Sequence, residues 1–293
     1  MRHPIIKNTN RLERLFILMA LIIAGLIVST ITSVVVTLAG SGLTELSILR
    51  ISQISSQILT FILPPIAYAF LTKENPVVAL GFNRLKIHWL LLGLCMIYAI
   101  MPLNSVFAEW NANIKLPESM STLEEIMKNL QEKATEIMEK MVNVDNIGGL
   151  IINLIMIAGL AAFGEELLFR SIIQTSLIKI CRNAHIGIIL ASIIFSFIHF
   201  EFYGFLPRLV LGLLLGYMFY YSKNIWIPMA MHFANNGTIV FLYYLNNKGV
   251  TNINIDTFGQ TNTPILIASI IMMAALFYAS IKISNKENKE TII

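Results

Sequence analysis

The sequence has few charged residues and almost no cysteine, and each shortage excludes some classes of protein. Only 13% of its 293 residues are Asp, Glu, Lys or Arg, whereas a soluble domain carries about 25%. This composition disfavours a water-soluble enzyme, a disordered chain and a nucleic-acid-binding protein. The net charge of +4 does not point to nucleic acid either, because the basic residues are spread between apolar runs. The two cysteines, Cys95 and Cys181, lie in or beside apolar runs and indicate no disulfide framework or zinc knuckle.

Apolar sequence is what the chain has in abundance, with 56% hydrophobic residues. A helix that crosses the hydrocarbon core needs about 20 apolar residues. Eight stretches qualify as candidate spans, of which the sixth is short: 15–44, 51–72, 87–108, 146–164, 183–200, 209–222, 224–247 and 257–281. We therefore predict an all-α, polytopic membrane protein with about eight transmembrane helices.

The distribution of Lys and Arg predicts how the chain is oriented in the membrane. The segment before the first span is basic, and the apolar stretch after it is too long for a signal peptide, so we expect a retained first helix. Lys and Arg are more frequent on the side of the N-terminus than on the other side. We expect an integral protein of the bacterial inner (cytoplasmic) membrane with both termini in the cytoplasm.

The segment 109–145 is the one sizeable hydrophilic stretch. Its apolar residues recur at intervals of three and four and form one helix face, and its eight acidic residues outnumber four lysines. Ser121 and Glu124 fit a capping box at the start of this helix. The extramembrane helix either lies on the bilayer or over the spans, or acts as a lid or substrate-docking element. We expect residues 1–145 to hold three spans and this outer loop, and residues 146–293 a catalytic bundle, within one integrated membrane domain.

Charged residues inside apolar sequence are the most informative ones, because each costs roughly 2.5–3.5 kcal/mol at the bilayer centre. Glu165, Glu166 and Arg170 have apolar sequence on both sides. Glu166 and Arg170 share a helix face and can pair, whereas Glu165 lies about 100° around the helix from Glu166. One interpretation ends the helix near Phe169 and places the charges among lipid headgroups. The other continues the helix to Cys181, roughly 51 Å in all, and buries them.

Three more polar residues lie in later spans. His199 is near the end of the fifth span, and His232 and Asn236 share a face of the seventh. A lone histidine in an apolar helix is usually structural, but buried polar groups need partners, and these residues would be natural partners of the glutamates. His199 lies roughly 10 Å deeper in its helix than His232. Their convergence therefore requires tilted helices or a recessed start of the seventh span near Pro228.

Three motifs occur in order within apolar segments: Glu165-Glu166-x-x-x-Arg170, Phe195-x-x-x-His199 and His232-x-x-x-Asn236. Together they resemble the CAAX protease and bacteriocin-processing family (CPBP, or Abi) of intramembrane endopeptidases. The resemblance covers residues 150 to 245 and implies a helical fold with a polar cavity inside the membrane. It implies hydrolysis of a peptide bond in a membrane-associated protein or peptide. The first 145 residues contain no motif of this family.

Peptide hydrolysis requires an activated water, a donor to the oxyanion and a proton for the leaving amine. The family pattern makes Glu165 the base. His199 would hold the same water and later donate a proton, and His232 and Asn236 would be donors to the oxyanion. The ion pair of Glu166 and Arg170 would keep Glu165 oriented.

A metal-dependent alternative is also open. In it Glu165, His199 and His232 would be three ligands of a divalent ion such as zinc, with water in the fourth position. The favoured version requires no cofactor. The sequence contains no His-Glu-x-x-His motif, and it also lacks the Gly-x-Ser-Gly and Gly-x-Gly-Asp motifs of other intramembrane protease classes.

Two further functions compete with the protease. The first is a non-catalytic bacteriocin-immunity or scaffold protein of the same fold, whose polar cluster only holds helices together. The second is a small transporter or channel, which the absence of repeated halves disfavours. Because all six motif residues are intact, the sequence favours the enzyme. Its expected partners are a membrane-associated substrate and the lipid bilayer, and no nucleic acid.

Overall fold

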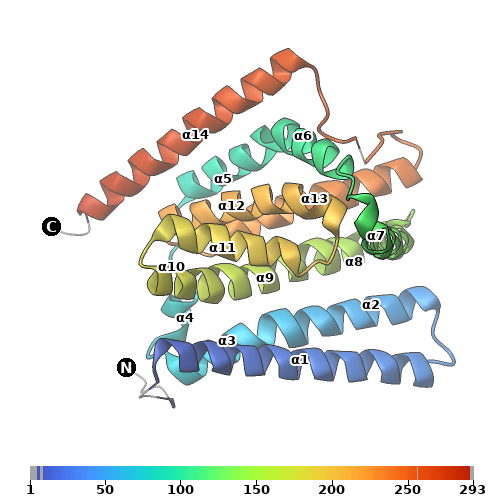
Figure 1. Cartoon of the computed structure of the whole chain (residues 1–293), viewed down its shortest axis with the longest axis horizontal. Helices are drawn as coiled ribbons and strands as arrows, with labels where there is room; N and C mark the ends of the chain where they lie inside the picture. The colour runs from blue at the N-terminus through green and yellow to red at the C-terminus, as the bar shows by residue number, and fades with distance from the viewer. Residues whose placement is uncertain (1–4, 7–8, 256, 291–293) are drawn as a thin grey trace.

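A computed structural model describes residues 5–6, 9–255 and 257–290. Over these ranges the chain is helical, without a β-strand, which confirms the predicted fold class. Most of the helices lie side by side in one bundle, and both termini are at the same end of it (Figure 1). An even number of crossings would place the termini on one side of a membrane in this way.

The elements follow one another along the chain as α-helices, except that η1, η3 and η4 are π-helical and η2 and η5 are 3₁₀-helical. Their bounds are α1 Arg11–Ala39, α2 Glu45–Ser56, η1 Gln57–Ile62, α3 Leu63–Thr72, α4 Pro76–Ala79, α5 Ile87–Ala99, α6 Met101–Ala112, η2 Glu118–Met120, α7 Ser121–Val142, α8 Ile147–Asn153, η3 Leu154–Leu160, α9 Ala161–Glu166, η4 Leu167–Gln174, α10 Thr175–Cys181, α11 Ala184–Phe197, η5 Phe202–Gly204, α12 Phe205–Ser222, α13 Trp226–Asn247 and α14 Thr263–Glu290.

Each of the eight expected spans overlaps a helix or a series of consecutive helices. Within the described residues, five runs are long and apolar enough to cross a membrane, and α5 and α6, which meet at a bend of 43°, make a sixth if they form one span. Helix α11 is apolar but short, and α13 carries the polar residues of the seventh span. The total of eight therefore stays a prediction, while the chain is an integral membrane protein.

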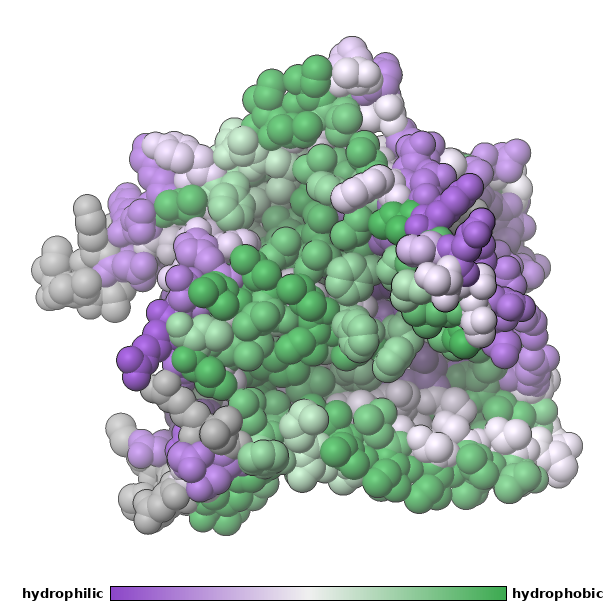
Figure 2. Space-filling view, in the orientation of Figure 1, coloured by the Kyte–Doolittle hydropathy of each residue, from purple (hydrophilic) through white to green (hydrophobic). Residues whose placement is uncertain are grey.

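The surface agrees with this membrane setting. Figure 2 shows a broad apolar band across the middle of the molecule, with hydrophilic residues gathered at its two ends. Large apolar side chains such as Leu38, Phe197 and Ile271 are exposed on the bundle. A soluble monomer rarely exposes apolar surface on this scale, and lipid is the solvent that suits it.

The first two runs form a closely packed hairpin. Helix α1 begins with a capping box in which Asn10 and Glu13 bond each other's backbone N–H groups. Farther along, a Cβ at Gly25 would lie 2.0 Å from the carbonyl oxygen of Leu59 in η1. Only glycine permits this approach of two backbones, so α1 packs directly against the π-helical turn of its neighbour.

The last helix begins later than predicted. The expected span starts at residue 257, whereas α14 begins at Thr263. The side chain of Asn262 accepts a hydrogen bond from the backbone N–H of Ile265 and caps the helix there. Pro264 follows in the first turn, where its missing N–H costs nothing. Capping therefore fixes this boundary, and hydropathy alone misplaces it.

The run Ile147–Cys181 is one unbroken helical segment. The interpretation that ends this helix near Phe169 is therefore wrong, and the longer helix is confirmed. Two π-helical stretches, η3 and η4, flank the α-helical turn α9 that carries Glu165 and Glu166. A π-helical turn widens the helix and rotates the residues beyond it, a feature frequent at functional sites.

Helix α7 lies across the end of the bundle opposite the termini (Figure 1). Lys140 pairs with Glu45 of α2 at 2.9 Å, and the amide of Asn153 donates to the carbonyl of Met141 at 2.8 Å. The predicted capping box is wrong, because Ser121 is already the first helical residue. The carboxylate of Glu124 instead accepts from the backbone N–H of Leu116 at 3.3 Å.

Candidate active site

Glu165 and Glu166 occupy adjacent faces of α9 deep in the bundle. Glu166 and Arg170 are completely buried, and Glu165 is 8% exposed. These values rule out a headgroup location for the three charges. The one-residue step between the glutamates turns them to different surroundings, as the helical geometry predicts.

Glu166 is bound by two partners inside the protein. Its Oε2 accepts from Nε of Arg170 at 2.7 Å, and its Oε1 lies 3.0 Å from Nδ1 of His232. Arg170 also stacks over the ring of Phe195, with 4.9 Å between its Cζ and the ring centroid. Because a carboxylate accepts hydrogen bonds, Nδ1 of His232 carries the proton and donates it to Glu166. The Glu166–Arg170 pair predicted from the sequence is present, and it also holds the imidazole of His232.

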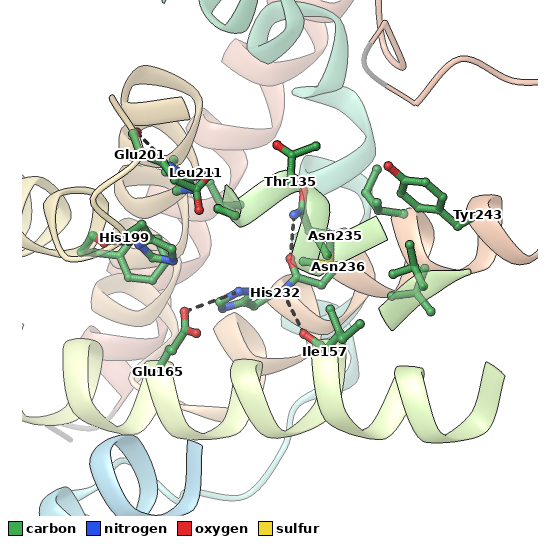
Figure 3. A pocket seen from close by; sticks show the side chains of 17 residues that line it. Thr135, Ile157, Glu165, His199, Glu201, Leu211, His232, Asn235, Asn236 and Tyr243 are labelled. Atoms are coloured by element: carbon green, nitrogen blue, oxygen red, sulfur yellow. Dashed lines mark hydrogen bonds and ion pairs between the residues drawn. The ribbon is translucent and has the colours of Figure 1, made fainter. Parts of the chain in front are cut away.

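Glu165 has looser contacts. Nε2 of His232 lies 4.0 Å from its Oε2, and Nε2 of Gln57 lies 3.5 Å from its Oε1. Figure 3 shows its carboxylate directed towards the ring of His232 and the open space beside it. These long contacts leave the carboxylate able to accept further hydrogen bonds.

His199 reaches the same space from beyond the end of α11. That helix ends at Phe197, and Nδ1 of His199 lies 2.8 Å from the carbonyl oxygen of Phe195. The ring of Phe195 contacts both imidazoles edge-on, with centroid distances of 5.3 Å to His199 and 6.1 Å to His232. Phe195 thus packs against both histidines.

Asn236 lies one turn beyond His232 on α13. Its Nδ2 donates to the carbonyl of Ile157 at 3.3 Å, and its Oδ1 accepts from the amide of Asn235 at 3.0 Å. Both amides line the same cavity as His232. The backbone contact ties α13 to the helix run that carries the glutamates.

The convergence of the two histidines depends on where α13 begins. The connection before it is buried, with Asn224 at 4% exposure and Ile225 at 0%. The amide of Asn224 donates to the carbonyls of Asn83 and Arg84 at 3.1 and 3.0 Å. The start of α13 is thus packed against the connection between α4 and α5, and His232 and His199 line one cavity.

These side chains line a cavity of about 400 Å³. Glu165, His199, His232 and Asn236 all face it (Figure 3), whereas Glu166 and Arg170 lie behind His232 and do not line it. Helix α7 covers the cavity with Ala134, Thr135 and Met138. The six predicted residues are thus one cluster, with four at the cavity and two in support.

Sequence reasoning missed several polar residues of this cavity. Glu201 and Arg208 form an ion pair at its rim, and Gln131 of α7 donates to Glu201 at 3.2 Å. Gln57 comes from the second span and is 5% exposed. The same apolar stretch also contains Gln53, so the sequence alone does not single out Gln57. No sequence signal joins Gln131 to Glu201, because they belong to separate segments.

The metal-dependent alternative needs three ligands close to one point. Among the described residues, no group of three or more His, Cys, Asp or Glu side chains is arranged to hold a metal ion. Nδ1 of His232 is engaged by Glu166 and Nδ1 of His199 by a carbonyl. This leaves Nε2 of each ring available, and histidines that bind metals are held through their other nitrogen in the same way. The choice between the glutamate and the metal-dependent mechanism therefore rests on the metal test described below.

Comparison with known proteins agrees with the motifs. Residues 147–238 match the model of the Rce1-like family, described as type II CAAX prenyl endopeptidase Rce1-like. This segment contains all six predicted site residues and confirms the family resemblance there. The Bacillus subtilis (strain 168) protein named uncharacterized protein YpbD is 36% identical over 85 residues, which are 28% of this chain and 40% of YpbD. This chain thus matches less than half of the length of YpbD. No solved structure matches this chain.

Proposed function

We propose that the Rce1-like segment at residues 147–238 is the catalytic centre of an intramembrane endopeptidase. Its substrate is a membrane-associated protein or peptide, and its reaction is hydrolysis of a peptide bond. The observation that carries this proposal is the cavity, into which Glu165, His199 and His232 project from three separate segments of the chain. A cluster that only held helices together would not need an open space of about 400 Å³ beside its carboxylate.

Glu165 is the general base in this proposal, and His199 shares the water with it. Nδ1 of His199 must donate to the carbonyl of Phe195, because a carbonyl only accepts. The neutral ring therefore presents the lone pair of Nε2. A water between Glu165 and His199 then has an acceptor for each of its hydrogens and directs its own lone pair at the scissile carbonyl. The abstracted proton passes to the leaving amine.

His232 and Asn236 stabilise the oxyanion. Since Nδ1 of His232 donates to Glu166, its Nε2 is a donor only when the ring is protonated. A protonated ring balances the charge of the cluster, in which two carboxylates otherwise face one guanidinium. Asn236 supplies a second donor, because its amide nitrogen has two hydrogens and the carbonyl of Ile157 uses one. Both donors are fixed before the substrate arrives.

The remaining residues position the reacting groups. Glu166 and Arg170 hold His232 and the helix face, and Gln57 holds Glu165 from the second span. The contact of Gln57 supports one integrated membrane domain, in which residues 1–145 complete the catalytic bundle of residues 146–293. Helix α7 acts as a lid or docking element over the cavity. It lies outside the inner membrane in this proposal, with both termini in the cytoplasm.

The proposed mechanism routes no step through a metal ion, and the metal-dependent version is its alternative. The Rce1-like family description names prenylated substrates for that family, and the residues of this cavity do not by themselves select a prenyl group. We therefore propose the substrate class as membrane-associated peptides. Full activity of metal-stripped protein, with metal content measured on the same sample, supports the glutamate mechanism, and activity that returns only with added zinc contradicts it.

The function is tested with purified full-length protein in proteoliposomes. Candidate substrates are membrane peptides that accumulate in a strain lacking the protein, and products are identified by mass spectrometry. The parent should cleave at least one of them. Glu165→Gln and His199→Ala should lower the rate by about 10²–10⁴-fold, the usual contribution of general acid–base catalysis.

Matched controls remove the same kinds of group elsewhere. Glu118→Gln changes an exposed acid, and His185→Ala changes an exposed histidine bonded to Tyr217. Both controls should cleave like the parent. If Glu165→Gln and His199→Ala fold and cleave as well as the controls, the site assignment is wrong. If the parent cleaves none of the accumulated peptides, the protease proposal itself is wrong.

A further inference from the structure

A second polar cavity lies at the opposite end of the bundle, where both termini are found (Figure 1). Its volume is about 290 Å³. It lies between the start of α1, the connection from α3 to α4, and the run from η4 to α10. Its polar lining includes Arg14, Tyr68, Lys73, Ser171, Thr175, Ser176 and Lys179. We call it the basic cavity.

Among the residues that the structure describes, the lining of the basic cavity gathers cations from three separate segments and contains no acidic residue. Nε of Arg14 donates to the hydroxyl of Thr9 at 3.1 Å, and Nζ of Lys73 lies 5.8 Å from the ring centroid of Tyr68. Neither contact neutralises a charge. Of the two acids next to these residues in sequence, Glu13 is bonded to Asn10 and Glu74 is exposed.

Holding these cations together carries an electrostatic cost. Lys73 is half-buried, and burial lowers its pKa, with Lys179 and Arg14 lowering the pKa further by repulsion. Removal of charge from water is favourable only with a partner of opposite sign. The hydroxyls of Ser171 and Thr175 donate to the carbonyls of Leu80 and Ile172. The cations are therefore the main donors that the basic cavity offers to an anion.

We propose that the basic cavity binds the phosphate group of an anionic ligand, and that an anionic phospholipid of the surrounding membrane supplies it. Arg offers a planar fork and Lys a point charge to phosphate oxygens. The position fits a headgroup, because Arg14, Lys73 and Lys179 each lie at or next to the end of a helical run long enough to cross a membrane. Ile180 and Val78 are exposed apolar residues beside it, suited to the acyl chains. Basic pockets between membrane helices bind lipid headgroups by this chemistry.

The ligand would connect parts of the fold that are far apart in sequence. Arg14 belongs to α1 and Lys179 to α10, the end of the same run that carries Glu165. A phosphate held by both would fasten the first hairpin to the catalytic helix. This inference does not depend on the proposed protease activity, since none of these residues lines the catalytic cavity.

Delipidated full-length protein in detergent provides the test, with binding measured by native mass spectrometry. The probes are phosphatidylglycerol, zwitterionic phosphatidylcholine and inorganic phosphate. Phosphatidylglycerol should bind more tightly than phosphatidylcholine. Each of Lys73→Gln and Lys179→Gln should weaken phosphatidylglycerol binding about fivefold, and the double variant about 25-fold, from the usual contribution of one basic residue near anionic lipid.

The control is Arg84→Gln, which removes an exposed positive charge at the same end but outside the basic cavity. It should bind phosphatidylglycerol like the parent. Lys73→Arg keeps the positive charge and should retain phosphatidylglycerol binding. Retained binding in this variant shows that the weaker binding of Lys73→Gln comes from the lost charge and not from a disturbed fold. Tight binding of inorganic phosphate with the same dependence on Lys73 upholds the phosphate site and identifies free phosphate as a source. Equal affinity of the lysine variants, Arg84→Gln and the parent for every probe overturns the proposal.

Discussion

The catalytic cavity and the basic cavity lie in one bundle but differ in how their charges are compensated. Around Glu165 both signs are present, and Glu166, Arg170 and His232 are bonded to one another. Around Lys73 the charged lining residues that the structure describes are all positive. Buried charge requires a partner. The first cluster finds its partners within the protein, and we propose that an anionic ligand supplies one to Arg14 and Lys73.

The difference follows from depth in the bundle. Glu166 and Arg170 are completely buried, so only other side chains of the chain can reach them. Lys179 is exposed and Lys73 half-buried, so water and lipid headgroups can reach the basic cavity. Charged side chains that pair with each other inside the protein keep a fixed geometry, which suits catalysis. Charged side chains that solvent and lipid can reach leave a site for a ligand.

Removing Arg170 should have the largest effect on the charge compensation around the catalytic cavity. Arg170→Met leaves Glu166 buried with its main partner gone, and should lower the free energy of unfolding by about 3–5 kcal/mol. Arg84→Gln, an exposed cation, should change it by no more than about 0.5 kcal/mol. Unfolding of both variants in mixed micelles, followed by circular dichroism, gives the comparison.

A second variant checks the cause. Adding Glu166→Gln to Arg170→Met removes the stranded charge and should restore part of the lost stability. If the double variant is no more stable than Arg170→Met, lost packing rather than uncompensated charge explains the effect.

Asn236→Ala sharpens the difference between a group that reacts and one that supports it. Loss of an oxyanion donor should lower kcat by about 10²–10³-fold with little change in KM. Asn235→Ala removes the neighbouring amide, which bonds Asn236, and should have a smaller effect. Cleavage kinetics on one substrate decide the matter, and equal losses in both variants would show that Asn236 has no direct contact with the oxyanion.

Gln131→Leu probes the cover that α7 provides over the catalytic cavity. It removes the hydrogen bond from α7 to Glu201, worth about 0.5–1.5 kcal/mol. Amide hydrogen exchange in the middle of α7 should become roughly fivefold faster for a loss of about 1 kcal/mol. Lys133→Gln, an exposed change on the same helix, is the control. Identical exchange in the two variants would show that the hydrogen bond from Gln131 to Glu201 does not hold α7 over the cavity.

The smallest effect concerns pH at the basic cavity. Burial, Lys179 and Arg14 lower the pKa of Lys73 below its ordinary value of 10.5. Between the lowered pKa and 10.5 the unfolded chain binds more protons than the folded one, so the stability of lipid-free protein should rise with pH there. Affinity for phosphatidylglycerol should fall over the same window, because a neutral amine does not attract phosphate. Lys73→Gln should flatten both dependences, and an unchanged slope in that variant would exclude Lys73 as the titrating group.

Much of the site could be predicted because its motifs are local. Glu166 and Arg170 are four residues apart, and this spacing alone places them on one helix face. Apolar run lengths located the helices, although α14 begins six residues after the predicted 257 because Asn262 caps it at Thr263. The capping box at Ser121 failed for a similar reason, since η2 precedes α7 and changes where the helix begins.

The sequence by itself determined the helical membrane fold and which polar residues lie within it, because hydropathy and periodicity act between neighbours along the chain. Only the tertiary structure decided that α13 begins inside the protein, that Gln57 reaches Glu165, and that Arg14 and Lys73 share a cavity with Lys179. These contacts join helices that are distant in sequence. Their geometry depends on how closely the helices pack, as at Gly25, and no spacing within one helix encodes it.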